Sequence, residues 1–297
     1  MRRVDFLIKK IRKDTNNLTP NRFNDFDIGF FLCDSQRTIQ TVAINANVRS
    51  GMFSKEAIVD LQTNVSEYDL PEDIFSISSI NNIQIRHNDR NRWINAINLT
   101  ESELNRGWGY IVRNNKINVN PYPTNYNQNQ MRVVYVRKIY DIGPRYGTVT
   151  TLTPGTIGIV LNSIENVNDY FDYISVVDKD GKFRNEKLEI KSVTMNSPVV
   201  GEAAITIDPA ANTTGIIVGD FVVGGERTTT QSELPDVCEN LLVLMTERFI
   251  QYVDSSNDVK NASVLTQDEK TMIEDLFKNH TPDNPFPPIL STDYINL

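Results

Sequence analysis

The sequence contains few of the residues on which most enzyme chemistry depends. Among its 297 residues are only two cysteines, Cys33 and Cys238, and two histidines, His87 and His280. Two cysteines cannot build a disulfide framework or a four-cysteine zinc site, and two histidines leave little material for a metal site or a catalytic triad. No apolar run approaches the roughly 18 residues that span a bilayer. We therefore expect no metal, no cofactor and no membrane partner.

The motifs of common enzyme chemistry are also missing. The sequence has no GxxxxGK[ST], GxGxxG, GxSxG, HExxH or CxxC pattern. The glycine-rich stretch at 143–147 lacks the lysine of a phosphate-binding loop. The segment Asp178-Lys179-Asp180-Gly181 lacks the carboxylate spacing of a calcium loop, so we interpret it as a turn. We predict that the protein is not an enzyme.

Acidic residues outnumber basic ones, with 38 Asp and Glu against 30 Lys and Arg and a net charge of −8. Specific DNA-binding proteins usually present a basic face, so this balance argues against a DNA binder. Basic residues cluster only at the N-terminus, where apolar residues at helical spacing predict a short amphipathic helix. Two readings of this helix stay open, a contact with an acidic partner or DNA and an ordinary solvated helix. Its basic residues are Arg2, Arg3, Lys9, Lys10, Arg12 and Lys13.

Asparagine and isoleucine are abundant, with 33 and 30 copies, whereas alanine occurs only 9 times. Asn and Ile have AT-rich codons and Ala has GC-rich ones, which indicates an AT-rich genome. With so little alanine, the helices must be held by packing rather than by intrinsic propensity.

Helical patterns occupy both ends of the chain. One helix is expected to begin at Thr19-Pro20, another after Pro235, and a third at a capping box formed by Thr266 and Glu269. Between them, short runs from about residue 57 to 139 alternate apolar and polar residues, which predicts strands and hairpins. Residues 143–230 are rich in Thr, Val, Ile and Gly without a helical period, which predicts a small all-β module, either a barrel or a sandwich.

Together these patterns predict an α+β fold. We expect a helical bundle body with an antiparallel β-hairpin region over residues 1–142 and 231–278, with the β module inserted at 143–230. Residues 279–297 contain four prolines and are expected to form an extended arm, which either contacts a neighbouring molecule or is a disordered or self-packed tail. The arm residues expected to make this contact are Phe286, Pro287, Pro288, Ile289, Leu290 and Tyr294.

The order of these segments, with the run Tyr68 to Phe75, the loose Gly-x-Tyr-Ile-Val at 107–112 and the strand at 131–138, resembles one family. It is similar to the tail adaptor, or head-to-tail connector, proteins of tailed bacteriophages, especially the short-tailed kind. The similarity extends over residues 19–140 and 235–278, and the composition also suits an AT-rich phage such as a crAss-like phage. The residues that carry the family pattern are Tyr68, Asp69, Leu70, Pro71, Tyr110, Pro121, Pro123 and Tyr135.

The resemblance implies a virion structural protein, made in the host cytoplasm, at the capsid–tail junction. Such adaptors form a homo-oligomeric ring, commonly of twelve copies, with helices around a channel through which DNA only passes. The ring joins the portal protein to the next tail ring or tail tube protein. The β module departs from the short family members, so its role is not implied.

The sequence also leaves two functions open besides that of a connector ring. In the first, the β module is a tail-associated binding module that docks another tail protein or a host glycan, with Tyr170, Phe171, Asp172 and Tyr173 as contributors. The second, a tail-associated hydrolase, is disfavoured by the missing motifs.

Overall fold

The computed structural model describes residues 3–15, 23–45, 53–87, 92–100, 109–120, 130–162, 167–195, 201–256 and 266–278. The chain divides into two compact units. The first comprises Met1–Val48 and Ile139–Asn279, and the second comprises Arg49–Lys138 and His280–Leu297.

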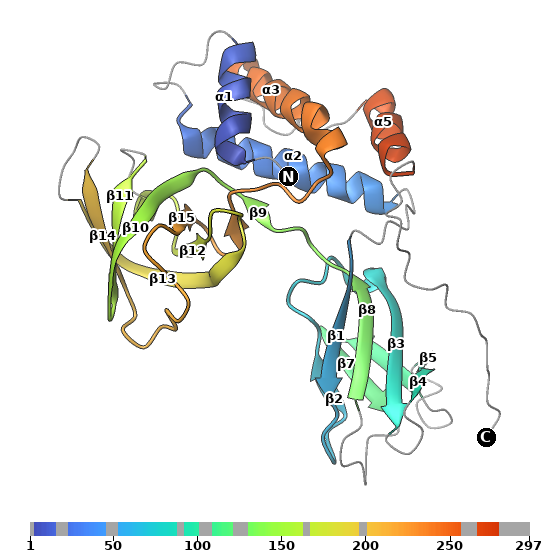
Figure 1. Ribbon diagram of the computed structural model, residues 1–297. Coiled ribbons are helices and arrows are strands. Elements are labelled where there is room, and N and C mark those ends of the chain that lie inside the picture. The colour runs from blue at the N-terminus through green and yellow to red at the C-terminus, as the bar shows by residue number, and fades with distance from the viewer. Residues whose placement is uncertain are drawn as a thin grey trace. The chain divides into compact units, whose positions relative to one another are not determined.

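The helices of the first unit are arranged around its longest helix, α2. They are α1 (Val4–Asp14), α2 (Asp25–Asn45), α3 (Glu239–Ser256) and α5 (Gln267–Lys278). Figure 1 shows α1, α3 and α5 along one side of α2, and all three contact it. None of the helices in the described part of the chain is both long and apolar enough to cross a membrane.

Two of these helices begin with reciprocal side-chain caps. The predicted capping box of α5 is confirmed, because the Glu269 amide donates to Thr266 Oγ1 while Glu269 Oε2 accepts from the Thr266 amide at 2.8 Å. Asn24 and Asp27 cap α2 in the same manner. The predicted start of α2 at Thr19-Pro20 lies outside the described residues.

The first unit also contains a closed six-stranded antiparallel barrel, which lies within the 143–230 segment. Its strands are β10 (Arg145–Thr153), β11 (Thr156–Leu161), β12 (Tyr173–Val177), β13 (Phe183–Met195), β14 (Glu202–Ile207) and β15 (Phe221–Gly224). They are ordered β10-β11-β14-β13-β12-β15, with β15 pairing back onto β10. Apolar side chains alternate into the interior, and Phe26 of α2 joins the same core. Helix α2 is therefore part of the barrel's packing as well as of the helical layer.

A two-stranded parallel pair stands where the chain enters and leaves the barrel. It is formed by β9 (Asp141–Ile142) and β16 (Thr228–Thr229). Two short 3-10 turns complete this unit. The turn η5 (Val167–Asp169) lies between β11 and β12, and η6 (Asp236–Cys238) leads directly into α3.

The second unit is a β-sandwich. One sheet has the order β1 (Ser54–Asp60), β8 (Gln130–Val136), β3 (Ile80–His87) and β4 (Arg92–Asn95), and the short turn η2 (Ile77–Ser79) precedes β3. The other has the order β2 (Glu67–Asp69), β7 (Lys116–Asn120), β6 (Gly109–Arg113) and β5 (Ile97–Asn98). Buried side chains of both sheets, among them Ile83, Val133 and Ile117, form one core.

The predicted turn at Asp178–Gly181 is confirmed, and a second tight turn joins two strands of the sandwich. Asn114 and Asn115 both have positive φ, of 50° and 60°, and join β6 to β7 as a two-residue hairpin turn requires. In the Asp178–Gly181 turn, Asp178 Oδ1 accepts hydrogen bonds from the amides of Asp180 and Lys182, and Gly181 has a φ of +77°.

The expected helical bundle body is wrong. The described residues between 54 and 136 form the sandwich and contain no α-helix, and strands hold more of the described chain than helices do. The hairpins were expected to be part of a body made mainly of helices. Strand β1, however, pairs with β8, so that Asp60 lies opposite Gln130, and local periodicity does not reveal so distant a partner. The first unit also resumes at Ile139, so the division within the chain differs from the 142/143 boundary that the sequence suggested.

Candidate functional site

Neither cysteine is available for chemistry in the folded protein. Cys33 on α2 and Cys238 in η6 are buried and free of disulfide bonds. Burial raises the pKa of the Cys33 thiol to about 12 and that of the Cys238 thiol to about 11. A buried thiol that stays protonated at neutral pH is a poor nucleophile and a poor metal ligand. His87 lies on β3, and His280 lies outside the described residues.

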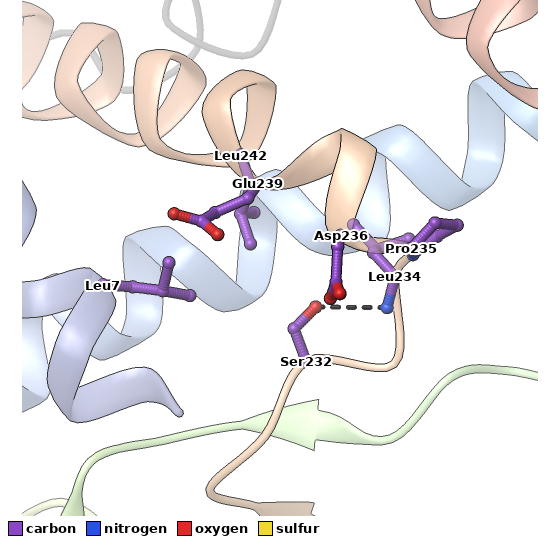
Figure 2. A pocket seen from close by; sticks show the side chains of 7 residues that line it. All are labelled: Leu7, Ser232, Leu234, Pro235, Asp236, Glu239 and Leu242. Carbon is purple, nitrogen blue, oxygen red and sulfur yellow. Dashed lines mark hydrogen bonds between the residues drawn. The ribbon is translucent and has the colours of Figure 1, made fainter. Parts of the chain in front are cut away.

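No group of three or more His, Cys, Asp and Glu side chains in the described chain could hold a metal ion. Figure 2 shows a small pocket where α1, η6 and α3 meet. It is lined by Leu7, Ser232, Leu234, Pro235, Asp236, Glu239 and Leu242. The Ser232 hydroxyl, one of the polar groups that line the pocket, already accepts a hydrogen bond from the Leu234 amide. The pocket has room for about one water molecule, which is too little for a substrate.

Half of the six basic residues of the N-terminal helix contact other side chains of the same protein. Arg3 pairs with Asp5 at 3.4 Å, and Lys10 donates to Asn240 Oδ1 on α3 at 2.8 Å. Arg12 donates to Asp25 Oδ1 on α2. Lys9 and Lys13 are exposed one helical turn apart, and Arg2 lies outside the described residues. Two of these six basic residues, Lys10 and Arg12, therefore fasten α1 to α3 and α2.

The family-pattern residues that the structure describes lie in the sandwich, and four of them belong to its core. Tyr68 is buried, and its hydroxyl accepts from the Gln62 amide and donates to the Val65 carbonyl. Leu70 and Tyr110 are buried in the same core. Asp69 is exposed beside Lys116, and the Pro71 carbonyl accepts from the Ile74 amide. Pro121 and Pro123 lie outside the described residues.

Tyr135 belongs to a polar network that the sequence did not reveal. Its buried hydroxyl donates to Asp73 Oδ1 at 2.6 Å, and the Lys55 ammonium contacts Asp73 Oδ2 at 2.6 Å. Burial tends to raise the pKa of the Asp73 carboxyl, but the hydrogen bonds from Lys55 and Tyr135 outweigh it, and the pKa is lowered. The network holds the segment after β2 against β1 and β8. The only sign of this network in the sequence was Asp73 itself, one of the acidic residues in the run from Tyr68 to Phe75.

A row of buried polar side chains on α2 holds the chain on either side of the barrel. Gln36 donates to the Tyr140 carbonyl at 2.9 Å and accepts from the Ser232 hydroxyl at 2.6 Å. One turn later, Gln40 Oε1 accepts from the Ile139 amide. Arg37 forms a two-pronged ion pair with Asp141 on the outside of the same turn. Helical periodicity alone does not reveal these contacts, because it cannot distinguish a buried amide side chain from an exposed one.

Aromatic side chains join α2 to the end of the barrel where β12 begins. Phe26 lies 5.3 Å from the Tyr170 ring and 5.8 Å from the Phe171 ring, measured between centroids. Phe30, one turn along α2, stacks on Phe171 at 5.4 Å. Although Phe26 is buried, Phe30 is 42% exposed and Tyr170 is 36% exposed. We call Phe30, Tyr170 and Phe171 the aromatic patch.

One side of the barrel carries almost no charge. No charged residue occurs from Tyr146 to Asn162 or from Pro209 to Gly219. Cross-strand rows of small side chains cover the outside, with Thr151 opposite Gly158 and Gly158 opposite Ala204. A Cβ on Gly158 would lie 2.1 Å from Thr151 Oγ1, so glycine lets the surface lie flat here. We call this the uncharged barrel face: Thr148, Thr151, Thr153, Thr156, Gly158, Ala204, Thr206, Ser192 and Thr194. Two exposed charged residues border it, Glu202 opposite Val160 and Lys191 beside Ser192.

Two apolar side chains stand beside this face. The loop between β14 and β15 exposes 56% of Ile217 and 66% of Val218. It is held in shape by hydrogen bonds from the Ile217 amide to Asp220 Oδ2 and from the Gly219 amide to the Val149 carbonyl. A fixed loop that presents aliphatic side chains next to an uncharged surface is typical of a protein contact.

The arm residues Phe286, Pro287, Pro288, Ile289, Leu290 and Tyr294 lie outside the described residues. No family model matches the chain, and no curated protein matches it. The candidate function therefore rests on the two surfaces, the uncharged barrel face and the aromatic patch.

Proposed function

We propose that this protein is a structural virion protein that forms a ring between the portal vertex and the tail of a tailed phage. The observation that carries the proposal is the uncharged barrel face with its flanking Ile217 and Val218. Interface centres are depleted in charge, and this face is depleted over several adjacent strands.

A closed ring needs two different surfaces on each copy, because its contacts are head-to-tail. The uncharged barrel face lies on β10, β11, β13 and β14, whereas the aromatic patch lies on α2 and the segment before β12. The first unit thus presents two chemically distinct surfaces on different elements. Subunits with one self-complementary surface would instead stop at dimers.

The net charge of −8 agrees with this role. Copies of an acidic chain repel one another, and a contact through an uncharged face avoids that cost. An acidic ring would also release phosphate rather than hold it, which suits a conduit for DNA.

A second role for the barrel, as a docking module for another tail protein, rests on the same face. A glycan site at residues 170–173 is less well supported. Phe171 packs against α2, and the Lys187 ammonium lies 4.6 Å over the Tyr173 ring. Tyr170 is engaged with Asn24 through its hydroxyl.

The proposal is tested by the mass of the purified chain in native mass spectrometry, alone and with the portal protein of the phage that encodes it. We expect a closed ring of many copies that binds the portal. A chain that remains monomeric at tens of micromolar, with and without portal protein, would refute the ring. A charge-insertion variant, Thr151→Lys with Thr153→Lys, should weaken assembly, whereas Lys187→Thr on the charged side of the barrel should not.

A further inference from the structure

The aromatic patch exposes aromatic surface beside the buried packing of Phe26. Phe26 fills the interior beneath it, in contact with Tyr146, Tyr170 and Phe171. Phe30 and Tyr170 contribute outward-facing ring surface that this core does not need. Adjacent exposed rings of this kind form the grooves that bind proline-rich peptides in the polyproline II conformation.

The same chain contains a matching ligand. Residues 282–288 read Pro-Asp-Asn-Pro-Phe-Pro-Pro, which contains two overlapping PxxP repeats, at Pro282/Pro285 and at Pro285/Pro288. Proline fixes φ near the polyproline II value, so such a segment loses little entropy when it binds. Phe286, Ile289 and Leu290 supply apolar side chains around it.

We propose that residues 282–290 of one copy dock on the aromatic patch of the neighbouring copy. This inference rests on the proposed ring and names its second contact. The segment follows α5, which packs on α2 of its own copy and ends at Lys278. Twelve residues from there to Leu290 span roughly 37 Å at about 3.1 Å per residue in polyproline II. A stiff segment of that length favours an outward reach over a tight reversal onto its own helix.

Two full-length variants test the contact by complementation. The patch variant is Phe30→Ala, and the arm variant combines Pro285→Ala with Pro288→Ala, which removes both PxxP repeats. Phe30 is 42% exposed and stacks on Phe171 rather than on Phe26, so its truncation leaves the buried Phe26 packing in place. Met272→Ala, which truncates a 49% exposed side chain on α5, is the matched control.

We expect each variant alone to assemble at least tenfold more weakly than the wild-type chain and the control. Mixed at a concentration where neither assembles alone, they should form a one-to-one dimer and grow no further, because each supplies only one half of the contact between arm and patch. Analytical ultracentrifugation distinguishes this dimer from monomers. If both variants assemble like the wild-type chain, or if neither assembles alone and the mixture stays monomeric, the inference is overturned while the ring proposal stands.

A labelled peptide of residues 279–297 separates the two proposals if the wild-type chain stays monomeric. Saturable binding in fluorescence anisotropy, lost in Phe30→Ala and retained in Met272→Ala, would support the assignment of the patch although the ring had failed. No binding to the wild-type monomer would overturn the assignment together with the ring.

Discussion

The Ser232 hydroxyl donates a 2.6 Å hydrogen bond to the buried Gln36 side chain, and so joins two residues that lie 196 positions apart. The other end of the same amide donates to the Tyr140 carbonyl. Tyr140 lies just before the barrel and Ser232 just after it, so one side chain on α2 fixes both connections.

Replacing Gln36 with Leu should therefore destabilise the first unit. The Tyr140 carbonyl would lose the hydrogen bond from the Gln36 amide in a partly buried setting, at a cost of about 2–4 kcal/mol in the free energy of unfolding. Urea denaturation followed by far-UV circular dichroism measures the change. Gln251→Leu, at an exposed position of α3, is the control and should shift stability by less than about 0.5 kcal/mol. Equal effects of the two substitutions would contradict the stabilising role of the Gln36 hydrogen bonds.

Gly29 allows α2 to approach the start of the barrel closely. An added Cβ would lie 2.6 Å from Pro144 Cδ, in a rigid ring that cannot rotate away. Gly29→Ala should therefore cost about 1–3 kcal/mol through overpacking, despite the better helix propensity of alanine. Thermal unfolding compares it with Thr41→Ala on the exposed side of α2, which we expect to be near neutral. A stabilised Gly29→Ala would show that the contact is loose.

The Asp73 network predicts how the stability of the sandwich depends on pH. The pKa of Asp73 is lowered in the folded state, so its contribution is fully present above the unfolded value of about 3.9 and is lost as the pH falls through the folded value. Asp73→Asn should be about 1–2 kcal/mol less stable than the wild-type chain at pH 7. The difference should shrink below about pH 4.

Denaturation at pH 7, 5, 4 and 3 checks this dependence. Asp69→Asn removes a carboxylate from an 87% exposed side chain of the same unit and should show little difference at any pH. A difference for Asp73→Asn that stays constant across the series would mean that its charge is not what the network stabilises.

The two thiols should resist modification in the native protein. Their pKa values of about 12 and about 11 leave almost no thiolate at pH 8, and both side chains are buried. Ellman's reagent should therefore titrate no thiol over minutes in buffer and two thiols in guanidinium chloride. Rapid reaction of one thiol in buffer would reveal an opening of the α2 or η6 packing.

Local chemistry in the sequence was sufficient for some elements. The Thr266–Glu269 capping box begins α5, and Asn114-Asn115 forms a hairpin turn, because both depend on residues only a few positions apart. The sandwich could not be anticipated in this way, since β1 finds its partner in β8 across the intervening strands.

The candidate surfaces were only partly foreseen. Tyr170 and Phe171 were noted as aromatics of the β module, but their partnership with Phe26 and Phe30 depends on how α2 packs against the barrel. That packing also means that the barrel cannot be deleted cleanly. Removal of residues 145–230 would expose Phe26, which belongs to the barrel core, so point substitutions are the sound test of its role.

The parallel pairing of β9 with β16 has a mechanical consequence. The chain enters β9 at its start and leaves β16 at its end, so tension along the backbone would shear the bonds between them together, including those from the Asp141 amide to Arg227 and from the Gly143 amide to Thr229. The tension would be carried by the pairing of β9 with β16. The barrel lies between these two strands in the chain, so it would carry no load while they stay paired. The barrel would therefore stay folded under tension until β9 and β16 separate.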